Sequence, residues 1–292
     1  MISVNTNQGA MVALQTLNRT NNQMEKTQNA IATGLKVASA KDNGALFAIA
    51  NKMTSDVGAY DRVRESTDRA LAILDTGIAA GESIMELLNE MKGKALAASS
   101  PGLSTSALAA LDADFGQLRN QIVSIVENAS FDGANMIRNF QANGTTANTV
   151  SNSIALGDAA GGNTITIAGA GLQLRATTAT VTAPEIMRFG QNESILAGGA
   201  AAATTAGLVT TSITNLGTQL ATWGAGAKRL EVHRTFVGKL QDALSNGIGA
   251  IVDADLAKES AKLQALQVKQ QLGVQALSIA NSSSQAALSL FR

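Results

Sequence analysis

The chain has 292 residues, of which 22 are lysine or arginine and 22 are aspartate or glutamate, so its formal net charge is zero. A balanced charge excludes the basic surface typical of nucleic-acid-binding proteins and the basic face typical of peripheral membrane proteins. Charged residues make up 15% of the chain and aromatic residues 3%, with a single tryptophan. So few bulky side chains favour helices that meet along narrow apolar stripes over a deep globular core.

The first 33 residues are polar but almost uncharged, and their large apolar residues are sparse. Many of these apolar residues share a heptad step in two groups, Val4 and Met11, then Leu17, Met24 and Ile31. A stripe this narrow buries too little surface to stabilise a lone helix. We therefore predict that this segment pairs with the other end of the chain, and then with neighbouring chains, and that both ends become ordered only on assembly.

Two longer apolar patterns follow. From Leu46 to Ala95 apolar residues recur with the 4-3 spacing of a coiled coil, which predicts a helix of roughly 50 residues. Pro101 and Gly102 mark a turn, after which the same spacing from Leu108 to Ala129 predicts a helix of roughly 25 residues.

Residues 131–204 differ in kind, because glycine, threonine, asparagine and alanine dominate there. Short alternations such as Thr164–Ile167 and Leu172–Arg175 predict modest strands. The 4-3 spacing then returns from Val209 to Ile251, interrupted only at Arg234 and Gln241, and predicts a return helix of roughly 40 residues.

The last segment resembles the first in composition. Its apolar residues are Leu256, Leu263 and Leu266, then Leu272 and Ile279, with Leu277 and Leu288 close to the stripe. The register slips between the two groups as a stutter would make it. The predicted fold is therefore mainly α: an elongated coiled-coil rod of long antiparallel helices, with paired terminal helices and a small β-rich segment in the middle.

Residues for catalysis are scarce. The chain has no cysteine and one histidine, His233, and it contains neither a phosphate-binding loop nor an HExxH motif. We predict no catalytic residue, no metal site and no cofactor. The uncharged stretch 194–227 is too polar for a membrane span, and the opening residues lack the basic and apolar regions of a signal peptide.

Several motifs at the two ends resemble bacterial flagellin, the filament subunit of the flagellum. They are Val4–Asn7 with Ala13-Leu14, Thr33–Gly44, Ala48–Ala50 with Met53, Asp253–Glu259, Gln270–Gly273, Ala280-Asn281 and Leu288–Arg292. Together these motifs cover residues 1–135 and 205–292, and the middle carries no family signature.

The resemblance implies a subunit that is exported unfolded through a type III apparatus and polymerises into an extracellular filament. Residues 1–33 and 253–292 would form an inner coiled-coil layer, residues 46–130 and 205–252 an outer helical layer, and residues 131–204 a variable surface segment. The partners implied are other copies of the chain in a helical homopolymer, the flagellar cap, the hook-junction proteins and an export chaperone, without nucleic acid or membrane insertion.

The resemblance also implies roles for individual residues. The assembly interface would include Val4, Asn5, Met11, Leu14, Leu17, Met24, Ile31, Leu256, Leu263, Leu266, Leu272, Ile279, Leu288, Leu290, Phe291 and Arg292. The linker at 34–45, between the inner and outer layers, would depend on Gly34, Leu35, Val37, Ser39, Asp42 and Gly44.

One family property is expected to be altered. Flagellins sensed by the mammalian Toll-like receptor for flagellin carry an arginine-containing stretch in the first long helix. The corresponding residues are Asn89, Glu90, Met91, Lys92, Gly93 and Lys94, without arginine and with a glycine expected to interrupt the helix. We predict weak receptor activation.

Two other classes of protein compete with a filament subunit. A hook–filament junction protein resembles flagellin at both ends, but it serves in a few copies and does not grow long homopolymers. A secreted coiled-coil adhesin or translocator would need an apolar hairpin, for which 194–227 is too polar.

Overall fold

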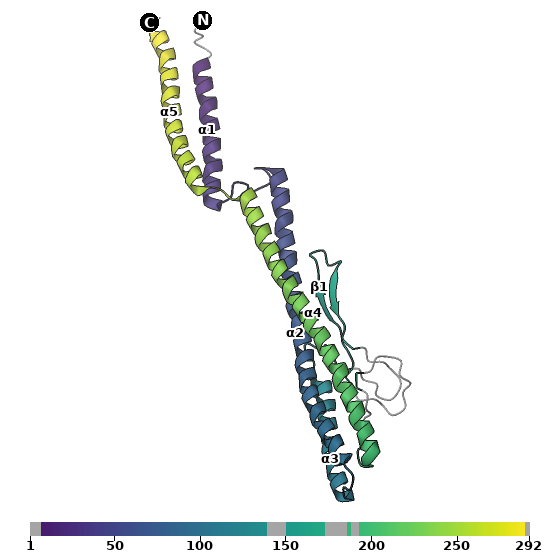
Figure 1. Cartoon of the computed structure of the whole chain (residues 1–292). Helices are drawn as coiled ribbons and strands as arrows, with labels where there is room; N and C mark the ends of the chain where they lie inside the picture. The colour runs from purple at the N-terminus through teal and green to yellow at the C-terminus, as the bar shows by residue number, and fades with distance from the viewer. Residues whose placement is uncertain (1–6, 139–149, 173–185, 188–192, 290–292) are drawn as a thin grey trace. The chain divides into compact units, whose positions relative to one another are not determined.

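The computed structural model describes residues 7–138, 150–172, 186–187 and 193–289, without the side chains of 283–289. In these ranges the chain is mainly α, as predicted, with five helices and a two-stranded sheet (Figure 1). The elements are α1 (Gln8–Thr33), α2 (Gly44–Ala98), α3 (Thr105–Asn128), β1 (Ser153–Leu156), β2 (Thr164–Ile167), α4 (Gly199–Val252) and α5 (Leu256–Ser289). No helix in the described ranges is long and apolar enough to cross a membrane.

The chain divides into two compact units. The terminal unit comprises residues 1–57 and 241–292, and the central unit comprises residues 58–240. In the terminal unit α1 and α5 lie side by side and antiparallel, with the start of α1 and the end of α5 at the same end of the pair (Figure 1). Asn7 begins α1, because its side-chain oxygen accepts a hydrogen bond from the Ala10 amide at 3.0 Å.

The two connections beside the α1–α5 pair are tied to each other. Leu35 and Asp253 form a β-bridge, the Lys36 amide donates to the carbonyl oxygen of Val252 at 2.6 Å, and the Ala254 amide donates to that of Gly34 at 2.8 Å. A small cluster of buried apolar residues lies next to these bonds, formed by Val37, Ala50 and Val252. Both chain segments are therefore held at the same place by backbone hydrogen bonds and by apolar contact.

The central unit has the larger core. Many of its fully buried side chains come from α2, α3 and α4, among them Leu74, Ile84, Phe115, Ile122 and Trp223. The Trp223 indole also donates to the Ala168 carbonyl oxygen at 3.0 Å, so its polar atom is satisfied inside the core.

Most residues of the predicted 4-3 stripes on the long helices are buried or half-buried. On α4, Val209, Leu216, Trp223 and Leu230 are all buried. Arg234, one of the two interruptions, is exposed and forms an ion pair with Asp68 at 2.7 Å. Gln241, the other interruption, is buried in the terminal unit, and its amide donates to the Val57 carbonyl oxygen at 3.3 Å.

Helix α4 is longer than predicted, with 54 residues. The additional turns begin at Gly199 and are rich in alanine, which has the highest helix propensity. Ala202, Thr205 and Ala206 bury their small side chains there, so a stripe of small residues was enough to extend the helix.

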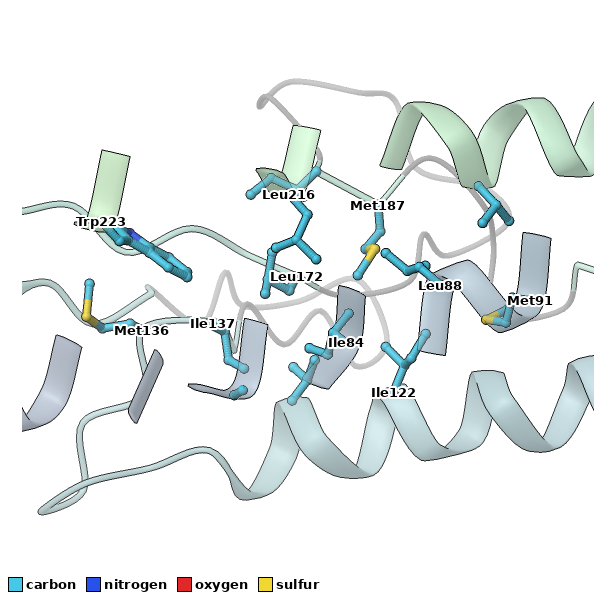
Figure 2. Close-up of a cluster of buried hydrophobic side chains, with 14 of the residues drawn as sticks. Ile84, Leu88, Met91, Ile122, Met136, Ile137, Leu172, Met187, Leu216 and Trp223 are labelled. Atoms are coloured by element: carbon cyan, nitrogen blue, oxygen red, sulfur yellow. The ribbon is translucent and has the colours of Figure 1, made fainter. Parts of the chain in front are cut away.

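The segment between α3 and α4 adds its apolar residues to the same core. Met136, Ile137, Leu172 and Met187 are buried beside residues of the three helices (Figure 2). The strand predicted at Thr164–Ile167 is confirmed as β2, which pairs antiparallel with β1. The second predicted strand, Leu172–Arg175, falls almost entirely outside the described residues.

The β1–β2 hairpin is fixed to the central unit by polar contacts. The Ser153 hydroxyl donates to the Ala70 carbonyl oxygen at 2.7 Å, and the Leu156 amide donates to the Ser66 hydroxyl oxygen at 3.1 Å. Ile165 and Ile167 face the core while Ile154 is half exposed, which is the alternation of a sheet with one buried face.

Candidate assembly surface

Helix α1 buries one narrow stripe against α5. Its less exposed residues follow a 4-3 spacing along the helix: Ala10, Ala13, Leu17, Thr20, Met24, Thr27 and Ile31. Thr20 and Thr27 are buried, and the apolar members are half-buried. The predicted residues Leu17, Met24 and Ile31 therefore contribute to pairing within one chain.

Helix α5 presents a matching stripe to α1. Its less exposed residues are Glu259, Leu263, Leu266, Gln270, Gly273, Leu277 and Ala280, again at 4-3 spacing. A Cβ atom placed on Gly273 would lie 3.3 Å from a methyl carbon of Leu17, so the glycine permits close approach of the two helices. We call this set of residues the paired stripe of α5.

The predicted stutter in the last segment is wrong. The paired stripe runs through α5 without a slip, and Leu272 and Ile279 lie outside it with 57% and 69% of their surface exposed. The prediction treats the leucines and isoleucine of this segment as one stripe, whereas Leu266 and Leu272 lie on different sides of the helix. On α1, the predicted interface residue Met11 likewise lies outside the residues that face α5, with 62% of its surface exposed.

The α1–α5 contact contains several polar groups. The Gln270 amide donates to the Asn21 side-chain oxygen at 2.9 Å, and the Asn7 amide donates to the Ala280 carbonyl oxygen at 2.7 Å. The buried Thr27 hydroxyl has no hydrogen-bond partner among the described residues. Such groups define the register of the two helices but add little stability, and an unsatisfied buried hydroxyl subtracts from it.

Large apolar side chains remain exposed on both terminal helices. On α1 they are Met11, Val12 and Leu14, and on α5 they are Leu256, Val268, Leu272, Val274 and Ile279. Val12, Val268 and Val274 were not predicted as surface residues of this kind. The signal was available for Val268, which precedes Leu272 by four residues on the same side of α5.

Five predicted interface residues cannot be placed. Val4, Asn5, Leu290, Phe291 and Arg292 lie outside the described residues. Leu288 lies within α5, but its side chain is not described.

The predicted linker residues lie in the tied connections of the terminal unit. Gly34 ends α1 with a φ of 71°, a left-handed conformation that glycine adopts without strain. Leu35 pairs with Asp253, Val37 is buried, and Gly44 is the first residue of α2.

Ser39 and Asp42 form a compact turn between Val37 and α2. One carboxylate oxygen of Asp42 accepts hydrogen bonds from the Ser39 hydroxyl and from the Ser39 amide, each at 3.0 Å. The hydroxyl bond and then the amide bond lower the pKa of Asp42 from its ordinary value, because both stabilise the charged form.

The stretch expected to match the receptor-binding region lies on α2 in the central unit. The expectation that Gly93 interrupts the helix is wrong, because α2 is continuous from Gly44 to Ala98. A single glycine costs a helix only about 1 kcal/mol. Its neighbours Met91 and Ala95 are both fully buried and hold the helix in place.

The remaining residues of this stretch differ in exposure. Asn89 and Glu90 are exposed, and the Asn89 amide donates to the Met85 carbonyl oxygen at 2.9 Å. Lys92 and Lys94 are half-buried, and Lys94 forms an ion pair with Asp114 of α3.

Comparison with known proteins connects this geometry to a family. Residues 4–142 match the model of the bacterial flagellin N-terminal helical region, and residues 206–291 match the model of the bacterial flagellin C-terminal helical region. The chain is 46% identical to flagellin FljK of Caulobacter vibrioides, over 99% of the chain and 98% of that protein. It is 37% identical to a flagellin of Brucella melitensis over the full length of both. A crystal structure of Bacillus cereus flagellin matches 59% of this chain and 88% of its own, with 22% identity and a TM-score of 0.47.

Proposed function

Because the chain belongs to the bacterial flagellin family, and is a structural subunit of a flagellar filament and not an enzyme, we propose that its copies assemble through their terminal helices. The proposal assigns two tasks to the apolar residues of α1 and α5. Those at the α1–α5 contact, such as Leu17 and Leu266, pair the two ends of one chain. Those on the exposed sides, such as Met11 and Leu272, meet neighbouring subunits.

The observation that carries this proposal is the apolar surface left over after pairing. Eight large apolar side chains of α1 and α5 are between 48% and 69% exposed, while the pair itself buries few apolar groups completely. Full burial of a valine, leucine or isoleucine side chain contributes about 1.5–3 kcal/mol. Contact between copies therefore supplies stabilisation that the single chain lacks, and folding of the two ends is coupled to assembly.

Truncation tests the proposal directly. Chains lacking residues 1–33 or 253–292 are expected to retain the helical central unit, because its core contains no residue from either segment. They are expected not to polymerise when seeded with filament fragments. Electron microscopy reads out polymerisation and circular dichroism reads out helix content; long filaments from either truncated chain would refute the proposal.

A substitution in the full chain gives a finer test. Leu266 is 4% exposed in the paired stripe, whereas the next residue, Gln267, is exposed. Leu266→Glu is expected to prevent seeded growth, because it buries a charge at the helix contact. Gln267→Glu adds the same charge at an exposed position and is the matched control, expected to polymerise normally.

We further propose that the subunit acts outside the cell, with the flagellar cap, the hook-junction proteins and an export chaperone as partners. The absence of cysteine from all 292 residues supports export as an unfolded chain, since a disulfide would obstruct threading through a narrow channel. Antibody labelling of intact cells tests the extracellular placement, and binding of the purified subunit to each purified partner tests the others.

We also propose that this subunit activates the mammalian flagellin receptor weakly. The helix surface at 89–94 offers Asn89, Glu90 and Gly93 as exposed groups and carries no arginine. A reporter-cell response equal to that of an arginine-containing flagellin at the same concentration would contradict this proposal.

A further inference from the structure

Helix α5 is apolar on two sides, and α1 covers only one of them. The paired stripe contains three large apolar residues that are buried or half-buried, namely Leu263, Leu266 and Leu277. A second set, which we call the uncovered set, contains three that are 55%, 57% and 69% exposed, namely Val268, Leu272 and Ile279. With 3.6 residues per turn, the centres of these two sets lie about 160° apart around the helix.

Apolar burial alone does not decide which of the two sides α1 covers. Each side offers three branched aliphatic side chains, and the members of each set are spaced so that they share one face of the helix. Helix α1 would therefore remove a comparable apolar area from water on either side. The choice between the two sides must come from other groups.

Two features of the paired stripe supply such a difference. The Gln270 amide donates a hydrogen bond to the Asn21 side-chain oxygen of α1 at 2.9 Å. Gly273 is the only glycine of α5, and a Cβ atom placed on it would lie 3.3 Å from a methyl carbon of Leu17. The paired stripe thus combines an amide donor for α1 with room for a leucine of α1.

Packing of α1 against the uncovered set would lose both features. Asn21 lies level with Gln270 along α5, and the nearest member of the uncovered set is Val268, two residues before it. A valine side chain cannot donate a hydrogen bond, and an amide group that is covered without a partner costs stability. Leu17 would also lose the room that the glycine provides.

We propose that the Asn21–Gln270 hydrogen bond and Gly273 select the side of α5 that α1 covers. The three residues are positioning residues, because they add little apolar contact but favour one of two otherwise similar packings. The inference concerns the pairing of two helices within one chain, so it does not depend on the assembly proposed above.

Disulfide formation in single chains can show which side is covered. The natural chain has no cysteine, and a Cβ atom on Gly9 would lie 3.7 Å from that of Ala280, within the range of a disulfide. Ala280 belongs to the paired stripe, whereas the preceding residue, Ile279, belongs to the uncovered set. The measurement is the effective concentration of the two thiols in the dilute full chain, against a glutathione redox buffer. We expect it to be at least about ten-fold higher for Gly9→Cys with Ala280→Cys than for Gly9→Cys with Ile279→Cys.

Asn21→Leu, made in both cysteine pairs, tests the hydrogen bond. The substitution keeps the size of the side chain but removes the oxygen that accepts from Gln270, and we expect the ratio of the two effective concentrations to fall about five-fold or more. Asn21→Asp keeps an oxygen in the same place and is the matched control. It is expected to keep the ratio within about two-fold of the starting value.

Gly273→Leu tests the close approach of the two helices. The added side chain would collide with Leu17, and we expect the ratio to fall by a similar factor. Gln267→Leu adds the same side chain at an exposed position outside both sets, and is expected to leave the ratio unchanged.

A change of side differs from a simple loss of pairing. If these residues select the side, the effective concentration for the Ile279→Cys pair rises while that for the Ala280→Cys pair falls. A fall of both values would mean that the residues only stabilise the pair, and would overturn the inference. A starting ratio near one, or a ratio that neither Asn21→Leu nor Gly273→Leu changes, would overturn it as well.

Discussion

The central unit and the α1–α5 pair use the same 4-3 pattern with very different results. In the central unit the pattern places Trp223, Phe115, Leu88 and Ile122 completely inside a core built from three helices and a hairpin. In the α1–α5 pair, the buried residues among the described side chains are Thr20, Thr27 and Leu266.

The difference shows how one sequence pattern serves two purposes. A stripe filled with large side chains between several helices makes a unit that is stable alone. A stripe that mixes large apolar residues with alanine, threonine and polar side chains, between two helices only, defines their register but is expected to give them less stability. The second arrangement suits ends that complete their folding only against other copies.

The largest expected effect is the loss of the buried Trp223 side chain, which tests whether the core stabilises the central unit. Trp223→Ala is expected to destabilise the central unit by about 3–5 kcal/mol, because it leaves a large cavity in the core. The measurement is denaturant unfolding followed by circular dichroism. Thr222→Ala, at the exposed neighbouring position, is expected to change stability by less than about 0.5 kcal/mol. A loss below about 1 kcal/mol for Trp223→Ala would mean that this core does not stabilise the unit.

Two glycines of α4 test how tightly the β1–β2 hairpin packs against that helix, with a smaller expected effect on stability. A Cβ atom on Gly226 would lie 2.7 Å from the Cδ1 atom of Ile167 in β2, whereas nothing lies within 4 Å of one on Gly224. Gly224→Ala is expected to stabilise the unit by about 0.5–1 kcal/mol through helix propensity. Gly226→Ala is expected to be less stable than Gly224→Ala by about 1–3 kcal/mol, because it crowds the hairpin. Equal melting temperatures for Gly224→Ala and Gly226→Ala would show that the hairpin moves away from the added methyl group without loss of stability.

Thr27 tests whether an unsatisfied polar group lowers the stability of the α1–α5 pair. Thr27→Val replaces an unsatisfied buried hydroxyl with a methyl group of the same shape, and is expected to stabilise the α1–α5 pair by about 1 kcal/mol. The measurement is amide hydrogen exchange in α1, which should slow about five-fold. Thr16→Val, at an exposed position of α1, is the control and should leave exchange nearly unchanged. Faster exchange in Thr27→Val would mean that the hydroxyl is satisfied.

The smallest expected effect concerns the Ser39–Asp42 turn. Because its folded-state pKa is lowered, the charged form of Asp42 stabilises the turn above the ordinary aspartate pKa of about 4. That contribution is lost as the pH falls through the lowered pKa. Ser39→Ala removes the hydroxyl bond and is expected to raise the Asp42 pKa, as measured by an NMR titration of the carboxyl group. Ser39→Thr keeps the hydroxyl and should leave the lowered pKa in place.

Much of the fold could be predicted because the long helices repeat one signal many times. The stripes through Leu74 and Leu88 on α2, and through Leu216 and Trp223 on α4, each run for many turns, so individual interruptions such as Arg234 did not hide them. The start of α4 was missed because alanines carry helix propensity but almost no periodic hydrophobic signal.

The sequence by itself determined that the chain is mainly α and that its end motifs resemble flagellin, and it predicts that the helices at its ends have too little apolar surface to be stable alone. The tertiary structure decided which side of each terminal helix faces inward. Leu266 and Leu272 are both leucines of the same heptad-rich segment, yet one is buried against α1 and the other is exposed. Periodicity locates apolar residues around a helix, but when a helix is apolar on two sides, only the position of its neighbour shows which side is already covered.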